Sequence, residues 1–455
     1  MKLIEITAPA LLLSFLIGIQ PAGAQSTASS DEKIQQLEQR VDELDQRLKV
    51  AERLKEIKTE EDADKARSAA SVTANGGPFT IRSGDGDFVL RIGADFQIDN
   101  RTFPGESSVA LTDQILIRRA RPTIQGTVYK YVDFYVRPDF GQGQVVLYEA
   151  YAQLNYFSRF NLRVGKFKPP VGLERLQSDD DTNFIERGLP TLLAPSRDIG
   201  YQLSGDIIKN RVSYAVGVFN GVPDNSLSDA SVSDHRDYAA RIFLTPFQPN
   251  AKSPLRGLGV GIGASSGNVD GLTLPAYKTL GQNTFITFAS GVTSAGHRTR
   301  LAPQAYYYVG PFGLLTEYTL SEEGFQKGNV RRDISLRSWQ VQASYLLTGE
   351  KKVFGTLVPK RAFDPRNHGW GAFELAARVG DFSIEQGIYN YGFATATTSP
   401  RRAHEWVGGA SWYLNRMLRI TLDYGNTNFG GGATAANGGN RPSERVWLNR
   451  FQINF

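Results

Sequence analysis

Basic side chains recur along this sequence at positions where they could bind anions together. Arg91, for example, alternates with Leu90 and Ile92, so in an extended segment its side chain points away from theirs. The planar fork of a guanidinium group matches phosphate and carboxylate oxygens, which predicts reversible anion binding rather than bond making. The same alternation places one set of arginines on polar faces: Arg91, Arg119, Arg121, Arg137, Arg163, Arg378 and Arg419, with Arg211 and Arg241 as further candidates.

An alternative interpretation is that each arginine pairs with an acid on the same wall and only stiffens it. The acids available for such pairs are Asp95, Asp133, Asp139, Glu149 and Asp423. The collective charge supports anion binding independently, because residues 76–455 contain 41 basic and 33 acidic side chains, a net charge of +8. A wall with this excess raises the local concentration of anions.

A second group of basic residues lies in and beside residues 169–197, a segment rich in leucine, proline and phenylalanine. Folding back against the polar wall would remove these apolar side chains from water, so we expect this segment to form a constriction. Its candidate residues are Lys166, Lys168, Arg175, Arg187 and Arg197. The acidic run Asp179–Asp181 could be an exposed calcium or lipid-bridging site, although such runs are more often solvated.

Patterns that would indicate catalysis or a bound metal are weak. The sequence has no cysteine, which excludes disulfides and thiolate ligands, and its four histidines fall in expected loops or rims. Gly263-Ala-Ser265-Ser-Gly267 fits G-x-S-x-G, but no helical pattern follows it as a nucleophile elbow requires. We therefore expect no catalytic residue, cofactor or metal, and no nucleic-acid partner.

The elements that must position these side chains are predicted to be β-strands. After Gly76 the apolar residues follow a period of two: Phe88, Leu90 and Ile92 share one face, and Asp95 and Gln97 lie on the opposite one. Tight turns alternate with long connections, and aromatic residues gather at the tight turns, as in the interfacial girdle of a membrane barrel. No segment after the N-terminal region approaches 18 consecutive apolar residues.

We count about sixteen strands and expect an all-β fold, a closed transmembrane antiparallel β-barrel. The expected strands lie near residues 87–98, 115–128, 131–140, 146–156, 160–168, 198–208, 211–219, 238–245, 256–265, 300–309, 312–320, 336–347, 371–380, 404–414, 416–425 and 445–455. Such a barrel leaves its polar wall around a water-filled lumen. Soluble β-sandwiches alternate too, so the turn asymmetry and the aromatic girdle decide between them.

The N-terminal region carries two different signals. Residues 1–24 resemble an export signal, with Lys2, an apolar run and a small-residue cleavage site at Ala22-Gly23-Ala24. Residues 25–75 are expected to form a short periplasmic coiled coil, ending near Lys58, and a polar linker. Its heptad seam consists of Ile34, Leu37, Val41, Leu44, Leu48 and Ala51. A single amphipathic helix is the alternative, and residues 76–455 form the barrel.

Several segments resemble the phosphate-selective porins O and P. They are Arg118-Arg-Ala-Arg121, Lys166-Phe-Lys-Pro-Pro-Val-Gly172, Gln340-Val-Gln-Ala-Ser-Tyr-Leu-Leu-Thr-Gly-Glu350, Gly371-Ala-Phe-Glu-Leu-Ala-Ala-Arg378 and Ser411-Trp-Tyr-Leu-Asn415. The resemblance covers most of the chain after Gly76 and implies a sixteen-stranded trimeric anion channel with lumenal arginine and lysine. It also implies that an N-terminal coiled coil can precede the barrel. The acidic run at 179–181 departs from a basic phosphate pathway.

Together these observations predict passive, anion-favouring diffusion across an outer membrane, with phosphate or phosphate-containing anions as the expected solutes. A general, weakly selective diffusion channel is the alternative on the same fold. The expected partners are outer-membrane lipid, small anionic solutes, two further copies in a homotrimer, and the barrel-assembly machinery. That machinery would bind the C-terminal strand, which ends in Phe455.

Overall fold

The computed structural model describes residues 27–74, 77–105, 111–229, 234–432 and 441–455. The expected export signal, residues 1–24, lies outside them. The chain divides into two compact units, Met1–Ser68 and Ala69–Phe455.

The described part of the first unit is one long helix, α1 (Thr27–Ser68). Its expected heptad seam is exposed in the single chain, with Leu37 62% and Leu44 61% accessible. The helix continues to Ser68, beyond the expected end near Lys58, because Thr59–Ser68 is rich in strong helix formers such as Glu, Lys and Ala. Within the described residues, no helix has both the length and the apolar composition needed to cross a membrane.

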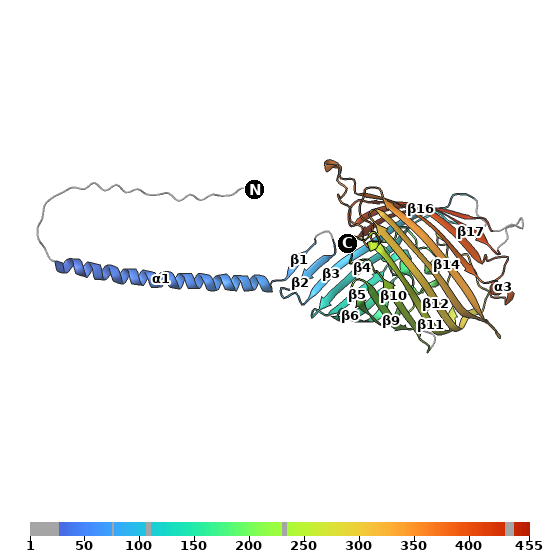
Figure 1. Ribbon diagram of the computed structural model, residues 1–455, viewed down its shortest axis with the longest axis horizontal. Coiled ribbons are helices and arrows are strands. Elements are labelled where there is room, and N and C mark those ends of the chain that lie inside the picture. The colour runs from blue at the N-terminus through green and yellow to red at the C-terminus, as the bar shows by residue number, and fades with distance from the viewer. Residues whose placement is uncertain (1–26, 75–76, 106–110, 230–233, 433–440) are drawn as a thin grey trace. The chain divides into compact units, whose positions relative to one another are not determined.

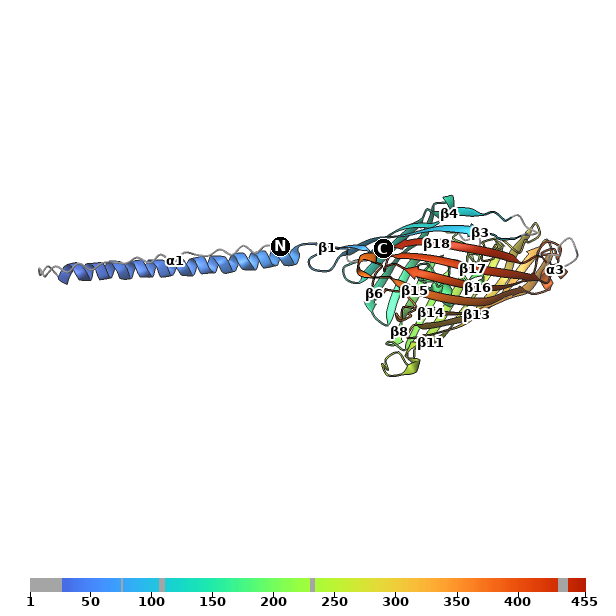
Figure 2. The same cartoon turned by 90° about the horizontal axis from the view of Figure 1, so that it is seen from above.

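The second unit is a closed ring of sixteen antiparallel strands, β3 to β18 (Figures 1 and 2). The ring closes where β18 pairs with β3, with Phe451 opposite Ile98. Each strand of the ring pairs with its neighbours along the chain, as expected when tight hairpins alternate with longer connections. The strands are β3 (Val89–Thr102), β4 (Gln114–Val128), β5 (Val132–Asp139), β6 (Val146–Phe157), β7 (Phe160–Phe167), β8 (Asp198–Ile208), β9 (Val212–Phe219), β10 (Asp237–Leu244), β11 (Leu258–Thr273), β12 (Val292–Val309), β13 (Phe312–Lys327), β14 (Val330–Leu346), β15 (Ala372–Ile384), β16 (Arg402–Tyr413), β17 (Leu418–Gly430) and β18 (Glu444–Asn454).

Short elements accompany the ring. β1 (Ser71–Thr73) pairs with β2 (Phe79–Arg82), which pairs in turn with β3, so part of the expected linker is extended. The connections contain the short helices α2 (Leu173–Leu176) and α3 (Gly387–Asn390) and the 3₁₀ helices η1 (Gly141–Gly143), η2 (Leu189–Leu193), η3 (Pro254–Gly257) and η4 (Pro365–Asn367).

The ring exposes its apolar face and buries its polar one. On β3, Asp95, Gln97 and Asp99 are at most 1% exposed, whereas the outward Ile92 is 41% exposed. This is the reverse of a soluble protein, in which charged side chains are almost never fully buried. The arrangement fits a barrel whose outer surface meets lipid and whose inner surface holds the charges.

The tight turns fall where the sequence predicts them, at one end of the ring. Three residues, 129–131, join β4 to β5, and both Tyr129 and Lys130 have positive φ, 49° and 64°. The long connection between β14 and β15 lies at this same end, because the Lys352 N–H donates to the Gly310 carbonyl of the β12–β13 turn.

Several strands run further than expected at the opposite end. The expected loop 321–335 is instead an extension of the β13–β14 hairpin, whose pairing continues to Lys327 and Val330. β11 and β12 likewise extend into the expected loop 266–299, to Thr273 and from Val292. These extensions are polar because strand ends beyond the apolar band meet water, so their composition resembles that of loops.

Candidate functional site

The candidate site is built around residues 168–197, which connect β7 to β8. The Leu173 N–H donates to Oε2 of Glu317 on β13 at 2.6 Å, and the Ile185 N–H donates to Oδ2 of Asp423 on β17 at 2.7 Å. At the other end of the segment, the Arg197 guanidinium donates to Glu149 of β6 at 2.7 Å. The segment therefore contacts inward-facing side chains on strands that are well separated around the ring.

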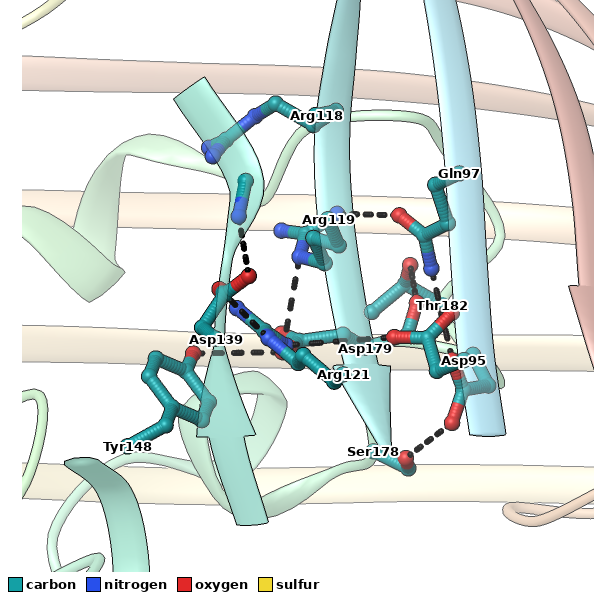
Figure 3. A network of polar contacts seen from close by, with 12 residues as sticks. Asp95, Gln97, Arg118, Arg119, Arg121, Asp139, Tyr148, Ser178, Asp179 and Thr182 are labelled. Atoms are coloured by element: carbon teal, nitrogen blue, oxygen red, sulfur yellow. Dashed lines mark hydrogen bonds and ion pairs between the residues drawn. The ribbon is translucent and has the colours of Figure 1, made fainter. Parts of the chain in front are cut away.

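Asp179 is the centre of a cluster of basic side chains (Figure 3). Its carboxylate lies 2.5 Å from Nη1 of Arg121, 2.6 Å from Nη2 of Arg187 and 3.6 Å from Nε of Arg119. The Tyr148 hydroxyl donates to it at 3.2 Å. Burial alone would raise the pKa of Asp179, but Arg119, Arg187 and Arg121 outweigh it and hold that pKa well below its ordinary value. Asp179 is therefore a buried carboxylate held by arginines, which corrects the expectation of a solvated or calcium-binding run.

Glu186 forms a second contact between the segment and the wall. Its carboxylate accepts two hydrogen bonds from Arg118, at 2.7 and 3.1 Å, and one from Arg101 at 3.3 Å. Burial opposes ionisation of Glu186, yet Arg118 and Arg101 hold its pKa below the ordinary value. This side chain is consequently a permanent negative charge between two arginines.

Arg118 reaches this position because of an irregularity in the β3–β4 ladder. Gln97 pairs with Arg119, whereas the next residue, Ile98, pairs with Ile117, which leaves Arg118 as the extra residue of a β-bulge. A bulge re-aims a side chain that strict alternation would send to the opposite face. The alternation in the sequence therefore did not predict that Arg118 faces inward, although this residue lies in the Arg118–Arg121 motif.

Other predicted arginines anchor the segment rather than face open space. Arg378 is 1% exposed, donates to Glu405 at 2.9 Å and to the Glu186 carbonyl at 2.9 Å. Arg419 donates to the carbonyls of Thr182 and Asn183, at 2.7 and 3.0 Å. These two guanidinium groups satisfy backbone carbonyls that would otherwise be buried without partners.

Residues of the segment contribute to the walls of two sizeable cavities. The first, of about 560 Å³, has Arg119, Arg121, Arg175 and Arg187 in its wall, together with loop residues at the end opposite the tight turns. The second, of about 380 Å³, is lined by Arg137, Arg163 and Lys168. Arg163 also borders a third cavity, of about 220 Å³, which includes Arg91. Two further candidates are held by acids: Lys166 lies 2.5 Å from Asp229 and Arg197 lies 2.7 Å from Glu149. Arg211 is wrongly predicted, because it is exposed in the turn between β8 and β9.

The structure thus brings most of the predicted basic residues into one region but pairs many of them with acids. Arg121 lies 2.7 Å from Asp139 and Arg137 lies 3.2 Å from Asp95, as the stiffening alternative expects. Several other inward arginines were not predicted, and Arg300 and Arg450 are two examples. Arg450 could have been found by alternation on the last strand, whereas Arg300 stands at the edge of an expected loop.

Among the described residues, no group of three or more potential ligands could hold a metal ion. Ser265 of the G-x-S-x-G pattern lies within β11 and accepts a hydrogen bond from Arg300 at 2.9 Å. Its hydroxyl is therefore engaged by a guanidinium group of the neighbouring strand β12.

Comparisons with known proteins agree with this architecture. The family model described as phosphate-selective porin O and P matches residues 90–455. Porin O of Pseudomonas aeruginosa is 24% identical over 403 residues, which is 78% of this chain and 88% of that protein.

Solved structures share the fold at low sequence identity. The outer membrane channel DcaP of Acinetobacter baumannii superposes with a TM-score of 0.54 at 10% identity, over 82% of this chain and 99% of that one. The anion-selective porin from Comamonas acidovorans gives a TM-score of 0.51 at 12% identity, over 81% of this chain and 100% of that one.

A closed barrel with an apolar exterior and a charged interior defines this chain as an outer-membrane porin, a channel and not an enzyme. The chain belongs to the phosphate-selective porin O and P family, whose model covers nearly the whole barrel.

Proposed function

We propose that this porin gives passive, anion-favouring diffusion through a water-filled barrel narrowed by the inward-folded segment 168–197. Phosphate or phosphate-containing anions are the proposed solutes. A general diffusion porin for small polar solutes is the alternative, because a wall of paired charges can be wet without being selective.

The observation that carries this proposal is the excess of guanidinium groups around Asp179. Arg119, Arg121 and Arg187 surround that one carboxylate. Arg121 also contacts Asp139, which lines the same cavity. Clustered guanidinium groups present paired N–H donors that suit the oxygens of a tetrahedral anion. The anion-selective porin from Comamonas acidovorans shares this fold, and both that protein and the phosphate-selective porin family agree with an anion pathway.

The proposed roles of the predicted residues follow from where their side chains lie. Those lining cavities are proposed to face passing anions, and those holding the segment are proposed to set its position. The first group is Arg91, Arg119, Arg121, Arg137, Arg163, Lys168, Arg175 and Arg187. The second group is Arg197, Arg378 and Arg419. Lys166 instead binds Asp229 and the Leu227 carbonyl, and it is proposed to hold the connection between β9 and β10.

A homotrimer is proposed from the shape of one wall of the barrel. β5, β7, β9 and β10 contain only eight residues each, whereas a strand needs about 9–11 residues to span the apolar core of a membrane. The outer surface of β7–β11 also carries an apolar hollow of about 610 Å³ between Tyr201 and Tyr238. A neighbouring copy, rather than lipid, is the proposed cover for this wall.

The two ends of the chain have proposed cellular roles. Residues 1–24 are proposed to direct export, and helix α1 is proposed to lie in the periplasm as a coiled coil of the trimer. Phe455, whose N–H and carbonyl both bond to Ala94 at 3.0 Å, ends the closing strand and is the proposed signal for barrel assembly.

The coiled coil can be tested with single cysteines, because the chain has none of its own. In the full-length protein, Val41→Cys lies on the apolar seam, and we expect it to give disulfide-linked dimers under mild oxidation. Gln46→Cys lies on the opposite side of the helix and is the matched control, which should remain monomeric on a denaturing gel. Equal cross-linking of the two variants would show that no ordered seam forms.

The phosphate pathway can be tested in a planar bilayer. Adding phosphate to chloride should reduce the chloride current at millimolar concentration, since an anion held by several guanidinium groups leaves slowly. If phosphate carries current in proportion to its mobility and causes no block, the general-porin alternative is correct.

A further inference from the structure

The cavity of about 380 Å³ differs in charge from the cluster around Asp179. It lies between residues 168–178 and the inward faces of β5–β10, and Arg137, Arg163, Lys168 and Arg241 contribute to its wall. Glu149 is its one acidic lining residue and is already bound to Arg197 at 2.7 Å. Within the described part of the chain, no carboxylate lies within 4 Å of the charged groups of Arg163, Lys168 or Arg241.

Arg163 is held in a fixed orientation with part of its fork free. Its guanidinium carbon lies 4.3 Å from the centre of the Tyr151 ring, and its Nε donates to Gln153 at 2.7 Å. No acceptor among the described residues contacts either Nη. A guanidinium that is stacked on a ring and tethered at Nε presents those nitrogens as a pre-organised pair of donors, which suits a carboxylate.

The other two basic residues complete the charged side of the cavity. Arg241 donates from Nε and Nη2 to Gln304, at 3.1 Å each, which leaves its Nη1 without an acceptor in the described chain. Lys168 donates only to backbone carbonyls, at 2.8 Å to that of Gln177. Burial, followed by the repulsion of Arg197 and Arg187, lowers the pKa of Lys168 well below its ordinary value. An anion beside Nζ would relieve that repulsion.

The remaining side of the cavity is mainly aromatic and aliphatic, with Ser178 and Gln202 as its polar residues. Tyr135 and Tyr151 stack with centres 5.2 Å apart and planes 13° apart, and Phe167 meets Tyr151 edge-on at 6.0 Å. Pro170 and Leu176 add aliphatic surface. The volume lies within the range of about 300–1,000 Å³ typical of organic ligand sites.

We propose that this cavity binds a small organic anion that joins a carboxylate to a flat apolar body, with the carboxylate on the free nitrogens of Arg163. The inference rests on the proposed function, because the ligand reaches the cavity through the anion-favouring lumen. This cavity is a second anion-binding site on the diffusion pathway, with a different chemistry, and it lies on the tight-turn side of the Asp179 cluster.

The test compares two probes in planar-bilayer recordings of the chloride current through the full-length porin. Benzoate has both the carboxylate and the flat body, whereas acetate has only the carboxylate. We expect benzoate to reach half-block at about a tenfold lower concentration than acetate. Arg163→Gln should raise the benzoate value by about tenfold, the expected loss of a charge-assisted fork.

Two further variants distinguish the contribution of the guanidinium fork of Arg163 from the contributions of its positive charge and of the Tyr151 ring. Arg163→Lys keeps the charge but loses the fork, and Tyr151→Leu keeps the arginine but loses the stacked ring; both should remove most of the benzoate preference. Arg159→Gln, in the exposed turn of the same hairpin, is the control and should leave the half-block concentration unchanged. Heat-modifiable migration on gels establishes that each variant is folded.

The possible results are distinct. Equal half-block by benzoate and acetate, or a benzoate block that Arg163→Gln leaves unaltered, would overturn the proposed site while phosphate block and anion preference remained. Cation preference of the unmodified porin would instead overturn the proposed function on which the site depends.

Discussion

Replacing residues 172–194 with a short Gly-Ser linker should raise the single-channel conductance roughly threefold or more, because a barrel of sixteen strands without an inner segment encloses a wide aqueous lumen. The barrel should still close, since Phe167 and Asp198 pair directly and a few residues suffice to join β7 to β8. The anion preference should fall at the same time, because ions would pass further from the wall charges. Conductance and reversal potential of the purified variant in planar bilayers measure both effects.

The matched control shortens a connection that lies away from the segment. Residues 246–253, between β10 and β11, are mostly exposed, and trimming them should leave conductance unchanged. If removal of residues 172–194 also left conductance unchanged in folded protein, the segment would not be the narrow part of the pathway.

Neutralising each partner of the central ion pair in a separate variant should change the ion selectivity in opposite directions. Arg121→Gln removes a positive charge 2.5 Å from Asp179, and Asp179→Asn removes the negative charge that Arg119, Arg121 and Arg187 share. One unit charge about 4 Å from a passing ion contributes about 1 kcal/mol in water, favourable for one sign of ion and unfavourable for the other, so the anion-to-cation permeability ratio changes by about thirtyfold. We expect Arg121→Gln to lower this ratio by about that factor and Asp179→Asn to raise it.

The reversal potential in a potassium chloride gradient measures both changes. Asp333→Asn, on the exposed end of β14, removes the same charge as Asp179→Asn and should not alter the ratio. A shift in the same direction for Arg121→Gln and Asp179→Asn would mean that these substitutions act by displacing the segment and not through charge.

The fold could be predicted because a membrane barrel imposes alternation wherever a strand meets lipid. The segment Phe88–Ile98 alternates almost without exception, and its outward and inward sets are those of β3. The predicted strands are too short where the observed strands extend beyond the apolar band. Arg331, Arg332 and Asp333 are consecutive charged residues of β14 that pair with β13, so no alternation of polar and apolar residues marks this part of the strand.

The candidate site was predicted less completely, because alternation locates a side chain on a face but does not identify its partners. It placed Arg119 and Arg121 inward, yet it could not show that Asp179 would lie between them. That pairing depends on how residues 168–197 fold against several strands at once. Arg118 was missed for a local reason, since a single extra residue in β4 reverses the face that alternation assigns.

The central claim is that the charged interior of this barrel favours anions, and the reversal potential of the unmodified porin tests it most directly. With a tenfold potassium chloride gradient across a planar bilayer, the sign of the zero-current potential shows which ion is more permeant. We predict the sign set by chloride. The anion preference should fall as the salt concentration rises, because salt screens the wall charges. A potential with the sign set by potassium would contradict the account.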